Sequence, residues 1–180
     1  MERSVVLIAL FAALVAALGL IPAVTLPSGI PITAQSMGIM LCGTILGARR
    51  GGLAVLLFIS LVALGLPLLA GGRGGIGVFT TPWAGFLFGF PVAAFVAGLG
   101  MRLGIPNLAV RACVAAFLGG IVALYAVAVP YYMVMKPAGL TEALTVAMAP
   151  FLPGDMIKVV FAGLITAAVL RARPGLMARG

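Results

Sequence analysis

Asp155 and Lys158 carry opposite charges three positions apart in the last apolar stretch of the chain, which opens FLPGDMIKVVFAGLI. Residues three apart share a face of a helix, so the carboxylate and the ammonium group would lie side by side. Either charge well inside a bilayer costs about 2.5–3.5 kcal/mol on insertion scales, so the pair needs a partner or a function. The structural alternatives are that Asp155 caps the helix and that Lys158 extends to the membrane interface. Because the chain has only three acidic residues, we favour a binding role.

A glycine-rich stretch, GGRGGIG, contains the pattern G-x-G-x-x-G at Gly72, Gly74 and Gly77, with Arg73 inside it. That pattern holds a dinucleotide only between a strand and a helix, and here it lies between two apolar stretches. We therefore reject a nucleotide site. The stretch is either a flexible connector or a loop whose backbone approaches a ligand closely, because glycine has no Cβ. We favour the second interpretation, a lid.

Residues for catalysis are scarce. The chain has no histidine, its carboxylates do not cluster, and no phosphate-binding loop of the form G-x-x-x-x-G-K-[ST] surrounds either lysine. Cys42 and Cys113 lie in separate apolar stretches without C-x-x-C spacing, which indicates packing roles. We expect no enzyme, no metal site, no cofactor and no ATP hydrolysis by this chain.

The elements that position these residues are predicted to be membrane helices. Of 180 residues 64% are hydrophobic and 8% are charged, too little polar surface to cover a soluble protein. We predict an all-α integral membrane protein that forms one domain over residues 1–180. The first stretch resembles a signal peptide, but we expect it to be retained as a span. The six predicted transmembrane helices cover roughly 4–21, 34–48, 52–69, 83–101, 109–134 and 155–170.

The positive charges predict the orientation. The formal net charge is +8, but the arginines lie at the ends of apolar stretches instead of forming a basic stripe, so nucleic acid is not expected as a partner. With six spans, one side carries eight basic residues and the other carries Arg73 and Lys136. The positive-inside rule therefore places both termini in the cytoplasm and Asp155 at the outer face. The eight are Arg3, Arg49, Arg50, Arg102, Arg111, Arg171, Arg173 and Arg179.

In the first apolar stretch, Ala9, Ala13 and Ala17 repeat at four-residue spacing beside a parallel row of Ala12 and Ala16. Rows of small residues let helix backbones approach closely in lipid. Packing within the chain and docking of a partner protein are equally compatible with this pattern.

Three motifs make the sequence resemble the BioY family, the biotin-specific substrate-binding (S) components of energy-coupling factor (ECF) transporters. They are P-I-T-x-Q at 31–35, G-x-R-R-G at 47–51 and P-G-D-x-x-K at 153–158. The resemblance runs from the first helix to the last. The sequence departs from the family pattern after the glycine run, where TPWAGFLFG stands in place of a P-T-G-G-Y-like segment. This difference leaves open which aromatic residue lines the pocket.

The resemblance implies a multi-pass protein of the cell membrane that binds biotin with high affinity for uptake. Its partners would be a transmembrane coupling subunit, docked on Ala9, Ala13 and Ala17, and two cytoplasmic ATPase subunits that hydrolyse ATP. The ligand-binding residues that we assign on this basis are Asp155, Lys158, Gln35, Thr33, Trp83, Phe86, Phe79 and Arg73. Two other functions stay open: a membrane enzyme that acts on a lipid or isoprenoid, and an assembly protein without a small-molecule ligand.

Overall fold

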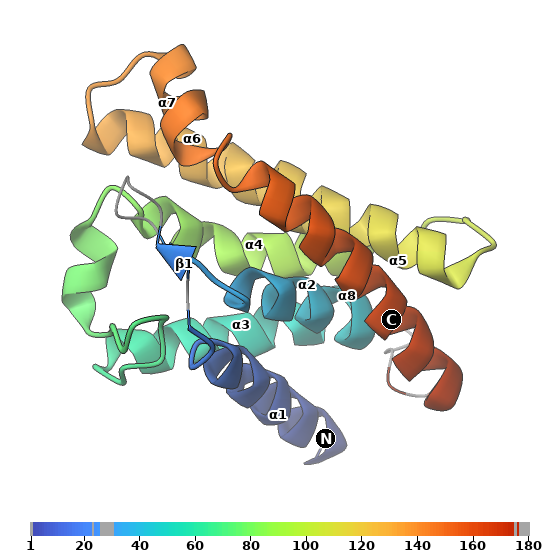
Figure 1. Cartoon of the computed structure of the whole chain (residues 1–180). Helices are drawn as coiled ribbons and strands as arrows, with labels where there is room; N and C mark the ends of the chain where they lie inside the picture. Colours follow the sequence, from blue (N-terminus) through green and yellow to red (C-terminus); the bar gives the residue numbers. More distant parts are fainter. Residues whose placement is uncertain (1, 23, 26–30, 175, 177–180) are drawn as a thin grey trace.

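The computed structural model describes residues 2–22, 24–25, 31–174 and 176, and most of them are helical, which confirms the all-α prediction. Long helices run roughly alongside one another, and a single two-residue strand pair lies beside them (Figure 1). The elements are α1 (Glu2–Leu18), β1 (Val24–Thr25), β2 (Pro31–Ile32), α2 (Gln35–Leu46), α3 (Ala48–Ala63), η1 (Ile76–Thr80), α4 (Ala84–Gly100), α5 (Leu108–Phe117), η2 (Leu118–Ala123), α6 (Leu124–Met135), α7 (Leu140–Ala147) and α8 (Leu152–Ala172).

The junction between α2 and α3 is a single residue, Gly47. Its φ of 81° lies in the region that favours glycine, and its N–H donates to the Gly43 carbonyl at 2.9 Å. The chain therefore leaves one helix and enters the next without a loop. The predicted break between the helices at 34–48 and 52–69 is wrong, because Arg49 and Arg50 lie in the first turn of α3. This helix also ends earlier than expected, and residues 64–75 form a loop.

A continuous helical segment of 28 residues, Leu108–Met135, is formed by α5, η2 and α6. Its middle part, Leu118–Ala123, is π-helical. Helices pack very closely there, since a Cβ on Gly119 would meet the backbone of α4 and one on Gly120 would meet the side chain of Met40. A π-helical turn contains more residues than an α-helical turn, so it changes which residues of α6 face the interior.

Two features near the C-terminal helix differ from the prediction. A short helix, α7, follows the long segment, and α8 begins at Leu152, three residues before its expected start. Phe151 occupies the N-cap position, and the Asp155 N–H already donates to the Phe151 carbonyl at 2.9 Å. The capping interpretation of Asp155 is therefore wrong, and its side chain is left for other contacts.

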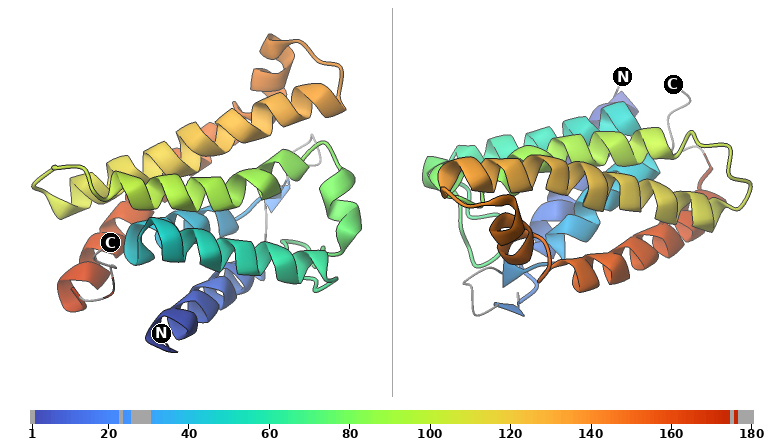
Figure 2. Two further views of the ribbon diagram at one scale, coloured as in Figure 1. Left: turned by 180° about the vertical axis from the view of Figure 1, so that it is seen from behind. Right: turned by 90° about the horizontal axis from the view of Figure 1, so that it is seen from above.

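Helix α4 packs mainly against α2, α3 and α6, while α8 packs on α2 and α5 and α1 packs on α3 and α2 (Figure 2). One buried polar contact joins α2 to α8: the hydroxyl oxygens of Thr44 and Thr166 lie 2.7 Å apart. Because the two hydroxyls satisfy each other, the core accommodates them without an unpaired polar group.

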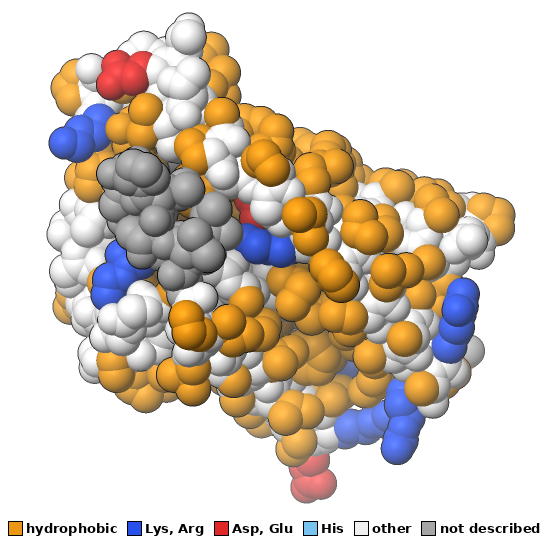
Figure 3. All heavy atoms as spheres, in the orientation of Figure 1, with side chains coloured by type: hydrophobic (Ala, Val, Ile, Leu, Met, Phe, Trp, Pro, Cys, Tyr) orange, Lys and Arg blue, Asp and Glu red, His pale blue; other side chains and the backbone are white. Residues whose placement is uncertain are grey.

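Hydrophobic side chains cover much of the face seen in Figure 3, and charged ones gather mainly toward its ends. By length and composition, two helical segments, Leu108–Met135 and Leu152–Ala172, could cross a membrane. Helices α2 and α4 are apolar but shorter. The strands and the loop that leads into η1 lie at one end of the helices, and the start of α1 and the end of α8 lie away from them (Figure 1).

Candidate functional site

A cavity of about 450 Å³ opens at the end of the molecule that carries the strands and η1. Its volume falls within the range of ligand-binding pockets, about 300–1,000 Å³. Its walls come from the start of α2, the loop between α3 and α4, the first half of α4, and the start of α8. Seven of the eight residues that the sequence assigns to ligand binding line it: Thr33, Gln35, Arg73, Trp83, Phe86, Asp155 and Lys158.

Asp155 and Lys158 form an ion pair on the cavity wall. The Lys158 ammonium donates to Asp155 Oδ1 at 2.8 Å and to the hydroxyl of Ser36 at 2.9 Å. Asp155 is only 4% exposed, whereas the Lys158 side chain is 15% exposed. The shared helix face predicted from the spacing of three is confirmed, and the two charges compensate each other in the cavity wall.

Two hydroxyl groups from other helices complete the surroundings of the carboxylate. Tyr125, on α6, donates to Asp155 Oδ2 at 2.6 Å, and Ser36, on α2, donates to Oδ1 at 3.4 Å. The carboxylate thus joins α8 to α2 and α6. Neither residue was predicted from the sequence. Ser36 could have been found, because it directly follows the assigned Gln35, whereas Tyr125 lies in a long apolar run where no local pattern marks it.

Gln35 lines the cavity, but backbone groups occupy its amide. Its Nε2 donates to the Leu68 carbonyl at 2.9 Å and to the Val15 carbonyl at 3.3 Å, and its Oε1 accepts from the Ala70 N–H at 3.1 Å. Gln35 therefore ties the end of α1 to the loop that precedes η1. Its contribution to the site is to hold that loop in place, and direct ligand contact by Gln35 stays a prediction.

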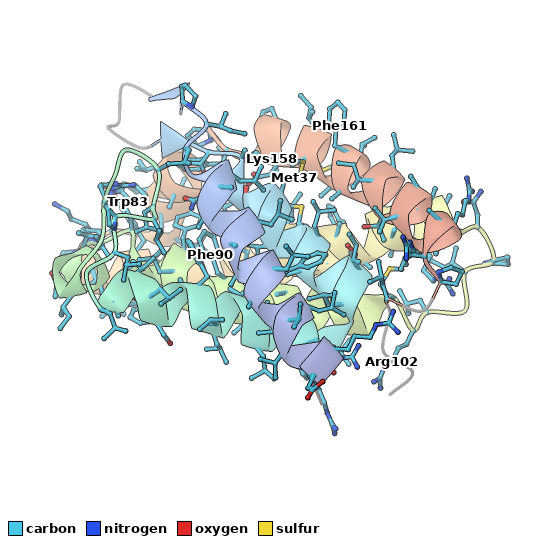
Figure 4. The ribbon with its side chains drawn as sticks, turned by 90° about the horizontal axis from the view of Figure 1, so that it is seen from below. Met37, Trp83, Phe90, Arg102, Lys158 and Phe161 are labelled. Atoms are coloured by element: carbon cyan, nitrogen blue, oxygen red, sulfur yellow. The ribbon has the colours of Figure 1, made fainter. Side chains whose placement is uncertain are left out.

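Four aromatic residues line the cavity: Trp83 just before α4, Phe86 and Phe90 in its first half, and Phe151 at the N-cap of α8. Trp83 packs against Tyr132 with a centroid distance of 5.0 Å, and Phe86 packs against Phe151 at 5.7 Å. The segment TPWAGFLFG therefore contributes Trp83 and Phe86 to the cavity. In Figure 4 Trp83 lies toward the end opposite Arg102, the end where the cavity opens.

The glycine run lines the mouth of the cavity with Gly72, Gly74, Gly77 and Arg73. A Cβ on Gly74 would collide with the Leu66 backbone, so glycine is required for the loop to fold on itself. Arg73 is exposed, and its Nε donates to the Ala70 carbonyl at 3.2 Å. The run is thus part of the cavity wall, and a lid motion stays a prediction.

Two assignments lie away from the cavity. Phe79 is not among its lining residues: its ring packs on Phe88 at 5.9 Å, and its carbonyl accepts from the Tyr131 hydroxyl at 3.2 Å. On α1, Ala9, Ala13 and Ala17 are all exposed, whereas Ala12 is buried against the rest of the protein and Ala16 is half-buried. Among the residues that the structure describes, this row thus faces outward, and docking of a partner on it stays a prediction.

Further lining residues were not assigned from the sequence, because side chains of this kind recur throughout an apolar chain. Besides Ser36 and the glycines they are Leu69, Val78, Thr81, Leu87, Phe90, Leu124 and Phe151.

The sequence model of the BioY family matches residues 2–175. The chain belongs to the BioY family. Proteins named biotin transporter BioY are similar to it over nearly their full length. The one from Rhodobacter capsulatus is 52% identical over 190 residues and covers 100% of both chains. The one from Rhizobium etli is 50% identical over 184 residues, 98% of each chain.

A solved structure has the same fold. The crystal structure of the S-component for biotin from an ECF-type ABC transporter matches with a TM-score of 0.85 and 26% sequence identity, over 94% of this chain and 92% of that chain. The arrangement described above is thus that of an S component, and the relatives within the BioY family are named as transporters.

Proposed function

We propose that this protein binds biotin with high affinity in the cavity and serves in its uptake as the S component of an ECF-type transporter. The proposal is supported by the names of its BioY relatives and of the matching S-component structure. Within the chain, the observation that carries it is the Asp155–Lys158 pair in a wall that also contains Trp83 and Phe86. A buried charge pair beside aromatic rings suits a ligand that is polar at its ends and apolar between them.

Biotin has such a chemistry: two N–H donors and a carbonyl on its ureido ring, a thioether ring, and an apolar chain that ends in a carboxylate. Asp155 accepts a ureido N–H group, because an ionised carboxylate accepts about four hydrogen bonds and three donors of the described chain reach it. Lys158 donates either to the ureido oxygen or to the carboxylate of the ligand. Trp83 and Phe86 cover the rings and the chain, at about 0.8 kcal/mol per buried methylene. Thr33 adds a neutral polar group, and Arg73 at the mouth pairs with the ligand carboxylate.

The partners in this proposal are a transmembrane coupling subunit and two cytoplasmic ATPase subunits, which hydrolyse ATP while this chain needs no cofactor of its own. The exposed row of Ala9, Ala13 and Ala17 supplies a surface on which another helix can approach closely.

We further propose that the chain forms one multi-pass domain in the cell membrane, with six spans, both termini in the cytoplasm and the cavity facing outward. The spans are α1, α2, α3, α4, the continuous Leu108–Met135 segment and α8. Some of these helices are shorter than the 20 residues that cross a hydrocarbon core of about 30 Å, so surrounding loops and bilayer adjustment complete the crossing.

Native mass spectrometry of the detergent-purified protein tests the function. Biotin should co-purify, or should bind at one molecule per chain when added to protein from biotin-starved cells. Absence of binding, with a folded protein, would contradict the proposal, and turnover of a lipid would favour an enzyme instead.

A further inference from the structure

The buried hydroxyl of Tyr125 has a role that the proposed function does not use. Tyr125 is 4% exposed and does not line the cavity, yet its hydroxyl reaches Asp155 Oδ2 at 2.6 Å. The two other donors to this carboxylate, Lys158 and Ser36, both line the cavity, and both reach Oδ1. Oδ1 therefore lies on the ligand side and Oδ2 on the protein side of the carboxylate.

The orientation of this carboxylate is not set by its own rotamer, because the last torsion of an Asp side chain is broad. Its hydrogen bonds decide the orientation. Lys158 is a long, flexible donor, whereas Tyr125 has a rigid ring that packs edge-on against Phe86 at 5.8 Å and an interplanar angle of 84°. Of the donors that the described part of the chain offers to Asp155, Tyr125 is the one with the most restricted position.

The helix that carries Tyr125 is built to present it. The π-helical segment Leu118–Ala123 ends two residues before Tyr125. Successive residues of an α-helix differ by about 100° around the axis, so the extra residue of a π turn moves Tyr125 to another face. As a result Leu124 lines the cavity while Tyr125 points at the carboxylate.

We propose that Tyr125 is a positioning residue for ligand binding: its hydroxyl fixes the plane of the Asp155 carboxylate so that Oδ1 meets a donor of the ligand, which replaces the long 3.4 Å bond from Ser36. The proposal rests on biotin binding at Asp155. In this role Tyr125 holds the Asp155 carboxylate in its binding orientation before the ligand arrives. Binding then costs less conformational entropy, because the ligand does not have to order the carboxylate itself.

Tyr125→Phe tests the proposal, because it keeps the ring and removes only the hydroxyl. The matched control is Tyr131→Phe on the same helix, which also removes one hydroxyl, that bonded to the Phe79 carbonyl at 3.2 Å. Biotin titrated into purified protein should bind Tyr125→Phe about tenfold more weakly, equivalent to 1.4 kcal/mol, and Tyr131→Phe as it binds the unmodified protein. Unchanged affinity in Tyr125→Phe, equal losses in both variants, or failure of Tyr125→Phe to fold would each overturn the proposal.

Infrared spectroscopy of the ligand-free protein separates positioning from packing. The chain has only three acidic side chains, so a carboxylate band that disappears in Asp155→Asn can be assigned to Asp155. This band should shift in Tyr125→Phe and stay in place in Tyr131→Phe, whereas an unshifted band would overturn the proposal. If the unmodified protein binds no biotin, the proposed function fails, and that result is distinct from every outcome of the comparison between variants.

Discussion

Replacing Asp155 by asparagine separates the charge of the carboxylate from its shape. In the structure Oδ2 accepts from Tyr125 at 2.6 Å, and Oδ1 accepts from Lys158 at 2.8 Å and from Ser36 at 3.4 Å. An amide has one oxygen and one NH₂ group, so only one of these two positions keeps an acceptor. Lys158 has only donors, whereas a tyrosine hydroxyl can rotate and accept. The amide oxygen should therefore face Lys158, and its NH₂ group should face Tyr125.

This arrangement lets the variant fold but weakens its site. Lys158 loses its counter-ion, and hydrogen bonds to a charged group contribute about 1.5–3 kcal/mol each. The amide oxygen that still faces the ligand is neutral, so its hydrogen bond from a ureido N–H loses charge assistance, a net loss of about 1 kcal/mol. Affinity for biotin should fall at least about tenfold, since 1.4 kcal/mol corresponds to a factor of ten. The melting temperature should also fall, because an ammonium group that is mostly buried is left without a counter-ion.

Isothermal titration calorimetry of the purified variants with biotin and with desthiobiotin measures the effect. Desthiobiotin keeps the ureido ring and lacks the sulfur, so it should bind the unmodified protein and lose affinity in Asp155→Asn as biotin does. Lys158→Met keeps an apolar stem of similar length and should likewise weaken binding. If Asp155→Asn binds both ligands with unchanged affinity, the carboxylate serves only the contacts among the helices, and our account of ureido recognition is refuted.

Three further changes probe the surroundings of the site. Ala13→Leu should leave biotin affinity unchanged and reduce co-purification of a coupling subunit, because a larger side chain on the exposed face of α1 prevents close helix approach; undiminished co-purification would contradict docking there. Gln35→Leu should speed hydrogen exchange at the Ala70 amide, since this N–H loses its acceptor, and an unchanged rate would show that the loop holds itself in place. For the orientation, Ile76→Cys, at a position 73% exposed, should react with an impermeant thiol reagent from outside intact cells, whereas Arg173→Cys should react only after lysis, with the unmodified protein as control. The opposite labelling pattern would reverse the proposed topology.

Much of the fold follows from local features of the sequence. Long apolar runs separated by glycine, proline and arginine predict helices, because the backbone groups in a membrane must be satisfied within the segment. Helix boundaries were less predictable. Gly47 ends one helix and allows the next to begin at once, so Arg49 and Arg50, which look like a connector, are helical. The start of α8 was also missed, and with it the true position of Asp155, one turn inside the helix.

The sequence by itself determined that Asp155 and Lys158 share a helix face, because a spacing of three has that consequence on any α-helix. It also determined that the chain is helical, since its long apolar runs leave few alternatives. Only the tertiary structure decided what meets the carboxylate. Tyr125 lies 30 positions away from Asp155, and Ser36 lies 119 positions away. Gln35 looks like a ligand-binding residue, but the fold brings the backbone of Leu68 and Ala70 to its amide. The physical reason is that a hydrogen bond between distant segments depends on how helices cross and turn, here through a π-helical segment, and no local pattern encodes that geometry.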